Sequence, residues 1–224
     1  MKLYYHPAST TCRPIMLLAA EAGIPLEMQL VDLFTGEQYK PHYEAVNPNH
    51  LVPVLQDGDF RLTESSAICK YLAEKSGSPL YPSGLQERAR INEVMDWVNT
   101  QLNRDLCYGF VYPQIFGFHK RRSEEAQQAQ LEWGKERAQG WLKVLDQHHL
   151  KAGNNYVCGD KISLADYFAA PFVHVAQLTG TDFAAYPNVQ AWLGRMKALP
   201  SWGKVFETIE GYGATLKGQP MVTV

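Results

Sequence analysis

The first segment whose side chains could do chemistry is the run Ser9–Pro14, with the sequence Ser-Thr-Thr-Cys-Arg-Pro. It follows a short β-type run and opens an apolar helical segment. Hydroxyl groups and free backbone N–H groups at the start of a helix favour an anion. Pro14 fits the first turn, where the donor that proline lacks has no intrahelical partner. The run predicts either an anion site at this helix start or a helix that one of the hydroxyls caps.

A second candidate is Val52-Pro53, which lies between a loop and a strand. Proline is accepted at the first position of a strand in the trans form, or it can turn the backbone in the cis form. A cis turn would leave the N–H and C=O groups of Val52 free to bind an extended peptide. The sequence is compatible with both isomers.

A third candidate is the pair Glu64-Ser65, at the end of a strand and the start of a helix. Ser65 is expected to cap the helix and to face a carboxylate together with nearby N–H groups. Glu64 could pair with an ammonium group, so the two together suit an α-amino acid end group, which carries both charges. The alternative is a capping serine after a solvated glutamate.

The elements around these candidates predict an α/β unit with a mixed sheet. A strand at 3–5, a helix at 14–22 that ends at Gly23, and a strand at 26–33 form a βαβ unit, which implies parallel pairing. Asp57-Gly58 separates two short apolar runs and predicts a hairpin. A helix is expected at 65–75.

The rest of the chain predicts an all-helical domain. Residues 77–84 are rich in Gly, Pro and Ser and read as a linker. Apolar residues keep helical spacing over 91–102 and 131–145, and shorter helices are expected at 188–199 and 201–210. Ser163 and Asp166 predict a capping box at another helix start. The expected division is therefore 1–77, a linker at 78–84, and 85–224.

Composition narrows the classes of function. The 224 residues contain 21 Lys plus Arg and 23 Asp plus Glu, so the net charge is close to zero. Nucleic acid and acidic membrane surfaces are therefore not expected as the main partner. The four cysteines lack zinc spacing, and His148-His149 lacks a third ligand, so no metal is expected. With no secretory signal or membrane span recognised, we expect a cytoplasmic protein with free thiols.

Taken together, the candidates resemble the cytosolic glutathione transferases over residues 1 to about 210, nearest the serine-type theta-like and bacterial members, including the halomethane-dehalogenating branch. The helical half adds Gly159-x-x-Ile162-Ser163-Leu164-Ala165-Asp166, which is similar to the family's capping motif. The resemblance implies a thioredoxin-like first domain. The matching motifs of that domain are Tyr5-His6-Pro7-Ala8-Ser9-x-x-Cys12-Arg13, Asn47-Pro48-x-x-x-Val52-Pro53-Val54-Leu55 and Asp57-Gly58-Asp59-Phe60-x-Leu62-Thr63-Glu64-Ser65-x-Ala67-Ile68.

The resemblance also implies roles for single residues. Ser9 would donate a hydrogen bond to the glutathione sulfur, with Thr10 or Thr11 as alternative donors. Leu51 departs from the Gln or Lys frequent in relatives, so one contact to the glycyl carboxylate is expected to be lost. The residues that would hold glutathione are Gln38 and Lys40 (glycyl end), His50 or Lys40 as replacement for the lost contact, Val52 and Pro53 (cysteinyl part), and Glu64, Ser65 and Asn99 (γ-glutamyl end).

A pocket for the electrophile is expected between the domains, lined by the aromatic stretch 106–118. Ordinary core packing is the alternative for each ring. The expected pocket residues are Tyr108, Phe110, Tyr112 and Phe116, with Phe118 in the same stretch.

The resulting hypothesis is a homodimeric glutathione transferase active in detoxification, which activates the thiol of its co-substrate glutathione for attack on small hydrophobic electrophiles and needs no metal. Two alternatives remain open from the sequence. One is a narrower glutathione-dependent dehalogenase, peroxidase or disulfide reductase. The other is a protein of the same fold that binds glutathione without catalysis.

Overall fold

The first third of the chain forms a four-stranded sheet. The computed structural model describes all residues 1–224. The strands β1 (Lys2–Tyr5), β2 (Glu27–Leu30), β3 (Val54–Asp57) and β4 (Phe60–Leu62) lie in the order β2-β1-β3-β4. β1 pairs in parallel with β2 and antiparallel with β3, which pairs antiparallel with β4. Helix α1 (Arg13–Glu21) makes the crossover that parallel pairing requires. The predicted mixed sheet is confirmed, including the hairpin, where Gly58 has a φ of 61°.

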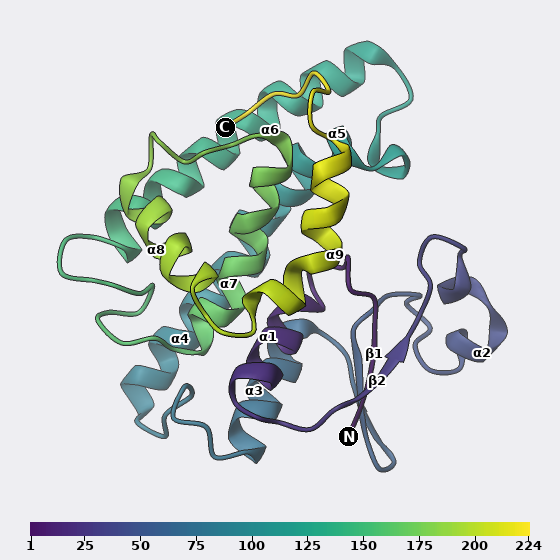
Figure 1. Cartoon of the computed structure of the whole chain (residues 1–224), viewed down its shortest axis with the longest axis vertical. Coiled ribbons are helices and arrows are strands. Elements are labelled where there is room, and N and C mark those ends of the chain that lie inside the picture. Colours follow the sequence, from purple (N-terminus) through teal and green to yellow (C-terminus); the bar gives the residue numbers. More distant parts are fainter.

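Two helices separate this sheet from the helical half of the molecule. α1 and α3 (Ser65–Lys75) pack against each other, and both contact α7 (Leu164–His174). The segment between β2 and β3, with η1 (Glu37–Tyr39) and α2 (Pro41–Glu44), lies on the far side of the sheet (Figure 1). One face of the sheet is therefore buried by helices, and the loops at its edge remain open for a site.

The second half contains helices only, as predicted. α7 lies at its centre, and every one of its residues is buried. α9 continues to Thr215, beyond the expected end at residue 210, because its apolar face packs on α1 and α8. The elements are α4 (Leu85–Trp97), the π-helical η2 (Val98–Val111), α5 (Tyr112–Ile115), η3 (Gly117–His119), α6 (Glu124–Val144), η4 (Leu145–His149), α7, η5 (Val175–Thr179), α8 (Pro187–Lys197) and α9 (Trp202–Thr215).

The start of α7 is fixed by one buried carboxylate. Asp166 accepts hydrogen bonds from the backbone N–H of Ser163 at 2.8 Å, the N–H of Val157 at 2.9 Å and the indole of Trp192 at 2.9 Å. Burial raises the pKa of Asp166, and these donors oppose the rise. The capping box predicted from Ser163 and Asp166 is confirmed. It joins α7, the loop before it and α8 at a single group.

Helices η2 and α6 cross at a very short distance. A Cβ atom on Gly134 of α6 would collide with the backbone carbonyl of Gly109 in η2. Glycine at this crossing lets the two helices pack side by side. A continuous cluster of 49 buried residues then joins the helical half to α1 and α3. None of the helices is long and apolar enough to cross a membrane.

Candidate active site

A cavity of about 710 Å³ lies where the loops of the sheet face the aromatic segment of the helical half. Its lining comes from residues 6–11, 33–39 and 50–52 on one side and 108–119 on the other. The first side presents hydroxyl and backbone groups, whereas the second presents the rings of Tyr108, Tyr112, Phe116 and Phe118. Such a cavity suits a ligand with a polar, peptide-like part and an apolar part.

A chain of hydroxyl groups lies on the polar side. Ser9 Oγ is 3.0 Å from Thr11 Oγ1, and Thr11 Oγ1 donates to the carbonyl oxygen of Val52 at 3.2 Å. Helix α1 begins only at Arg13, and no side chain caps it. The alternative interpretation, in which one of these hydroxyls serves as a helix cap, is therefore wrong. Their other bonds hold them at the cavity instead.

The loop that carries Ser9 is held from beneath by Arg13, which is fully buried. Its Nη1 donates to the carbonyl of Ala8 at 2.8 Å, and its Nη2 donates to the hydroxyl oxygen of Thr10 at 3.2 Å. The guanidinium also lies 5.4 Å from the ring centre of Phe206 in α9. Burial lowers the pKa of Arg13 to about 10, so it stays charged near neutral pH. The hydroxyl oxygen of Thr10 thus accepts from the guanidinium, whereas Ser9 meets Arg13 only through its backbone carbonyl, which accepts from the Arg13 N–H at 3.3 Å.

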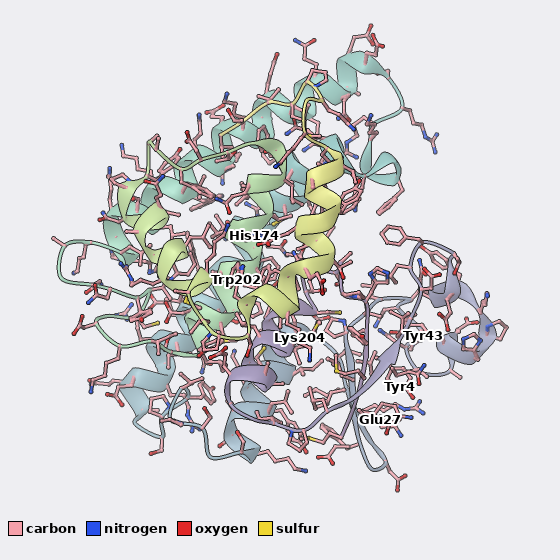
Figure 2. The ribbon with its side chains drawn as sticks, in the orientation of Figure 1. Tyr4, Glu27, Tyr43, His174, Trp202 and Lys204 are labelled. Carbon is pink, nitrogen blue, oxygen red and sulfur yellow. The ribbon has the colours of Figure 1, made fainter.

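The loop before β3 presents Val52 to the same cavity. Asn47 Nδ2 and the hydroxyl of Tyr43 both donate to the carbonyl of Leu51, at 2.8 Å and 2.7 Å. Tyr43 lies beside Tyr4 of β1, which ties the loop to the sheet (Figure 2). The Val52-Pro53 peptide is cis, and the N–H of Val52 has no hydrogen-bond partner within the protein. Its carbonyl is not free, because it accepts the bond from Thr11.

The start of α3 differs from the expectation. Ser65 is not the cap: it is the buried first residue of the helix, and Glu64 lies at the cap position with a φ of 64° and no side-chain capping bond. A non-glycine residue with positive φ is uncommon and is often found where function constrains the backbone. The N–H groups of residues 65–67 have no partner, so they leave a place for an anion.

Comparisons with known proteins agree with this geometry. Residues 8–75 match the model for "Glutathione S-transferase, N-terminal domain" and residues 111–200 the model for the C-terminal domain. Glutathione S-transferase theta-3 of Mus musculus is 32% identical over 88% of this chain and 82% of its own length. The chain belongs to the glutathione S-transferase family. The resemblance inferred from the sequence is confirmed.

Other transferases of the family give the same result. Glutathione S-transferase D7 of Drosophila melanogaster is 31% identical over 94% of this chain and 90% of its own length. The structure of human glutathione transferase theta-2, in complex with glutathione and an unknown ligand, superposes with a TM-score of 0.85 at 28% identity, covering 99% of this chain and 92% of that one. A delta-class transferase of Nilaparvata lugens gives 0.83 at 29% identity, covering 98% of this chain and 99% of that one.

Many of the residues predicted for a transferase site meet at the cavity, and others do not. Phe110 is fully buried in the core and does not line the cavity, because it lies on the inner face of η2. Glu64 does not line the cavity either, but it lies near it. Burial is the main cause of the raised pKa of Tyr108, and the negative charge of Glu64 adds to it. Lining residues among the candidates are Ser9, Thr10, Gln38, His50, Val52, Tyr108, Tyr112 and Phe116, whereas Lys40, Pro53, Glu64, Ser65, Asn99 and Phe110 do not line the cavity.

The lining residues of this transferase that were not identified as site residues from the sequence include four with aromatic rings, which are His6, Phe34, Tyr39 and His119. The rings of Phe34 and Tyr39 are both exposed, and both line the cavity, so they give it an apolar surface that a ligand can cover. Burial lowers the pKa of His6 and of His119, which keeps both rings neutral near pH 7. No lysine, arginine, aspartate or glutamate lines the cavity.

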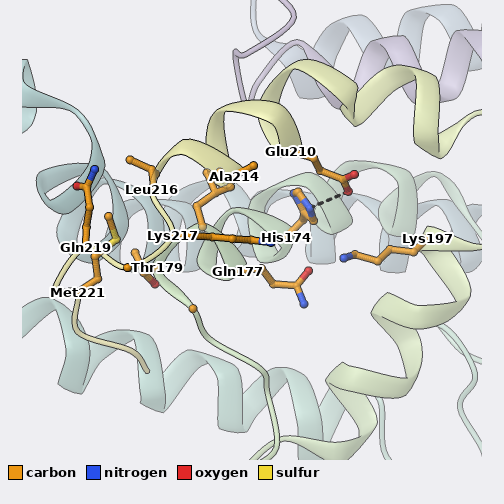
Figure 3. Close-up of a pocket in the computed structure, with 14 residues that line it drawn as sticks. His174, Gln177, Thr179, Lys197, Glu210, Ala214, Leu216, Lys217, Gln219 and Met221 are labelled. Carbon is orange, nitrogen blue, oxygen red and sulfur yellow. Dashed lines mark ion pairs between the residues drawn. The ribbon is translucent and has the colours of Figure 1, made fainter.

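A second cavity of about 620 Å³ lies in the helical half of the transferase, among η5, α9 and the C-terminal segment. His174 Nε2 is 3.4 Å from Glu210 Oε1, and the side chains of Lys197 and Lys217 extend toward this pair (Figure 3). Burial lowers the pKa of His174. The two cavities share no lining residue. Chemistry at Ser9 therefore involves the first cavity alone.

Proposed function

We propose that Ser9 donates a hydrogen bond to the sulfur of glutathione and stabilises its thiolate for attack on an electrophile. The chain has glutathione transferase function, which its family and its curated relatives support. The observation that carries the role of Ser9 is its position: its side chain is half-buried at the cavity, whereas the neighbouring Thr10 is buried against Arg13.

The energetic requirement is modest. A thiol with a pKa of about 8.5 is only a few per cent ionised at pH 7, and each unit of lowering is worth about 1.4 kcal/mol. A hydroxyl donor, with the partial positive charge of the turn before α1, is of the size needed for one to two units. Transfer then needs an electrophile held beside the sulfur, so proximity supplies the other part of the rate.

Three groups of contacts would hold the tripeptide. The free N–H of Val52 is available to the cysteinyl carbonyl. The free N–H groups at the start of α3 suit the γ-glutamyl carboxylate, and Glu64 beside them suits its ammonium group. His50 Nδ1 donates to the carbonyl of Gln38 at 2.9 Å, and in the doubly protonated ring Nε2 would donate to the glycyl carboxylate. In this arrangement His50 replaces the contact that Leu51 cannot make.

Tyr108, Tyr112 and Phe116 would form the wall against the electrophile. Tyr112 is buried, which raises the pKa of its hydroxyl well above the usual value, so the wall carries no charge near neutral pH. An uncharged aromatic wall favours small hydrophobic electrophiles. We extend the proposal to a homodimer active in detoxification in the cytoplasm; the four free cysteines support a reducing compartment.

The test is an ultraviolet difference titration of bound glutathione with the wild-type chain and with Ser9→Ala. A thiolate band is expected near neutral pH in the wild type and only near the pKa of the free thiol in Ser9→Ala, together with loss of conjugation of 1-chloro-2,4-dinitrobenzene. Thr10→Val tests the alternative donor. Loss of the band in Thr10→Val but not in Ser9→Ala would overturn the assignment.

A further inference from the structure

The hydroxyl chain on the polar side of the cavity has a fixed direction in the ligand-free protein. A carbonyl oxygen can only accept, so Thr11 gives its single hydroxyl hydrogen to Val52 at 3.2 Å. The bond of 3.0 Å between Ser9 and Thr11 must then use the hydrogen of Ser9. The hydrogen that the sulfur needs therefore points at Thr11 until a ligand arrives.

We propose that Thr11 is a hydrogen-bond switch that couples capture of the glutathione backbone at Val52 to activation of Ser9. When the cysteinyl N–H binds the Val52 carbonyl, Thr11 turns and donates to Ser9, and Ser9 donates to the thiolate. Within the protein only hydrogen bonds exchange and each hydroxyl keeps its hydrogen, while the proton of the thiol passes to solvent. This inference rests on the proposed function, because it assigns Val52 and Ser9 to the tripeptide.

The hydrogen bonds that run from Thr11 to Ser9 and on to the thiolate are stronger than those that run from Ser9 to Thr11 and on to Val52. The bond from Ser9 to the thiolate runs from a hydroxyl to an anion and is therefore charge-assisted. A donor behind Ser9 polarises its O–H group, and such cooperativity strengthens each bond by about 10–30%. Without Thr11, the oxygen of Ser9 would lose its hydroxyl partner.

The neighbouring groups do not duplicate the role of Thr11. The Thr10 oxygen accepts from Arg13, and burial raises the pKa of Cys12 to about 11, so that thiol stays neutral. Tyr43 and Asn47 bond to the carbonyl of Leu51, not to that of Val52. The titratable residues that line the cavity are His6, Tyr39, His50, Tyr108, Tyr112 and His119, and none of them has a hydrogen bond to Ser9 or Thr11.

Thr11→Val removes the hydroxyl and keeps the side-chain shape, whereas Thr11→Ser keeps the hydroxyl. The matched control is Thr215→Val, since the Thr215 hydroxyl also donates to a backbone carbonyl, that of Tyr212, but lies at the end of α9. Two quantities are measured for each variant: the pKa of the thiol of bound glutathione, and the affinity for S-methylglutathione, which has the backbone but forms no thiolate.

A switch predicts opposite effects in Thr11→Val. The thiol pKa rises by about half a unit, a roughly threefold smaller thiolate fraction near neutral pH. S-methylglutathione binds as tightly as before or a few times more tightly, because the Val52 carbonyl is already free. Thr11→Ser and Thr215→Val keep the wild-type values.

Other results overturn the inference. An unchanged thiol pKa in Thr11→Val, with the band still lost in Ser9→Ala, rejects the switch and leaves the proposed function intact. Weaker binding of S-methylglutathione in Thr11→Val assigns Thr11 a purely structural role in the loop. A wild-type chain without any thiolate band rejects the proposed function and the switch together.

Discussion

Arg13 and Ala8 are joined by a hydrogen bond of 2.8 Å from a fully buried guanidinium to a backbone carbonyl. Because Ser9 follows Ala8 directly, a side chain on α1 sets the position of the proposed thiolate donor without touching the cavity. The same guanidinium lies over Phe206, so the position of the loop depends on packing between the two halves of the molecule.

Arg13→Lys is expected to lower both activity and stability. Lysine keeps the charge but lacks the planar fork that reaches Ala8 and Thr10 together. The loss of one buried, charge-assisted bond costs about 2 kcal/mol of unfolding free energy, and displacement of Ser9 lowers kcat/KM roughly tenfold. Chemical denaturation and conjugation kinetics measure the two effects.

The control for this change is Arg195→Lys. Arg195 also donates twice to a backbone carbonyl, that of Asn155, but it lies in α8 far from the cavity. It is expected to leave kcat/KM at the wild-type value. Equal losses of activity in both variants would show that Arg13 contributes only to general stability.

Asn47→Asp is expected to weaken glutathione binding and leave the chemical step intact. The substitution replaces the donor to the Leu51 carbonyl by an oxygen that repels it, in a buried position. The loop that presents His50 and Val52 then loses one of its two anchors. A loss of about 1.4 kcal/mol raises KM for glutathione tenfold with little change in kcat.

Asn154→Asp provides the comparison, because Asn154 Nδ2 donates to the carbonyl of His149 at 2.8 Å in the helical half. A similar loss of stability is expected there, with KM unchanged. A drop in kcat for Asn47→Asp that exceeds its rise in KM would contradict a role limited to binding.

Local signals in the sequence were enough for much of the fold. Asp57-Gly58 predicted the hairpin, and Ser163 with Asp166 predicted the start of α7. Both predictions succeeded because the turn and the capping box each depend on residues no more than four positions apart. The motif around Ser9 likewise predicted a segment that lies at the cavity.

The remaining parts of the site depend on tertiary contacts. Phe34 and His119 are separated by more than eighty residues, and only packing of the two halves brings both to one cavity. Phe110 belongs to the same aromatic stretch as Tyr108 and Tyr112, but the rotation of η2 turns it into the core. Ser65 looked like a cap because its side chain suits one, whereas the backbone at Glu64 takes that position.

His149 is expected to make stability fall in mild acid. Burial, with a smaller effect of His148, lowers the pKa of His149 to about 4. Between pH 6.5 and 4 the unfolded chain therefore binds a proton that the folded chain does not, and stability decreases as pH falls. The decrease is at most about 1.4 kcal/mol for each pH unit and ends near pH 4.

His149→Phe keeps a ring against Trp97, whose centre lies 4.8 Å away. The difference in unfolding free energy between wild type and His149→Phe should shrink toward neutral pH and widen in favour of the variant as pH falls. His148→Asn, at an exposed position, is the control and should keep the fall in stability with acid, made slightly smaller because the charge of His148 no longer lowers the pKa of His149. A difference independent of pH would show that His149 already ionises in the folded chain.

Two glycines of α6 should respond to the same substitution with opposite signs. Gly134→Ala adds a Cβ atom that collides with the carbonyl of Gly109, so helices η2 and α6 must separate, at a cost of about 1–3 kcal/mol. Gly140 is exposed on the same helix, and a Cβ there meets no atom within 4 Å. Gly140→Ala is therefore expected to stabilise the protein by about 0.5–1 kcal/mol, because alanine loses less backbone entropy in a helix. Urea denaturation of the two variants against the wild type gives both values. If Gly134→Ala were neutral, η2 and α6 would not approach as closely in solution as this structure requires.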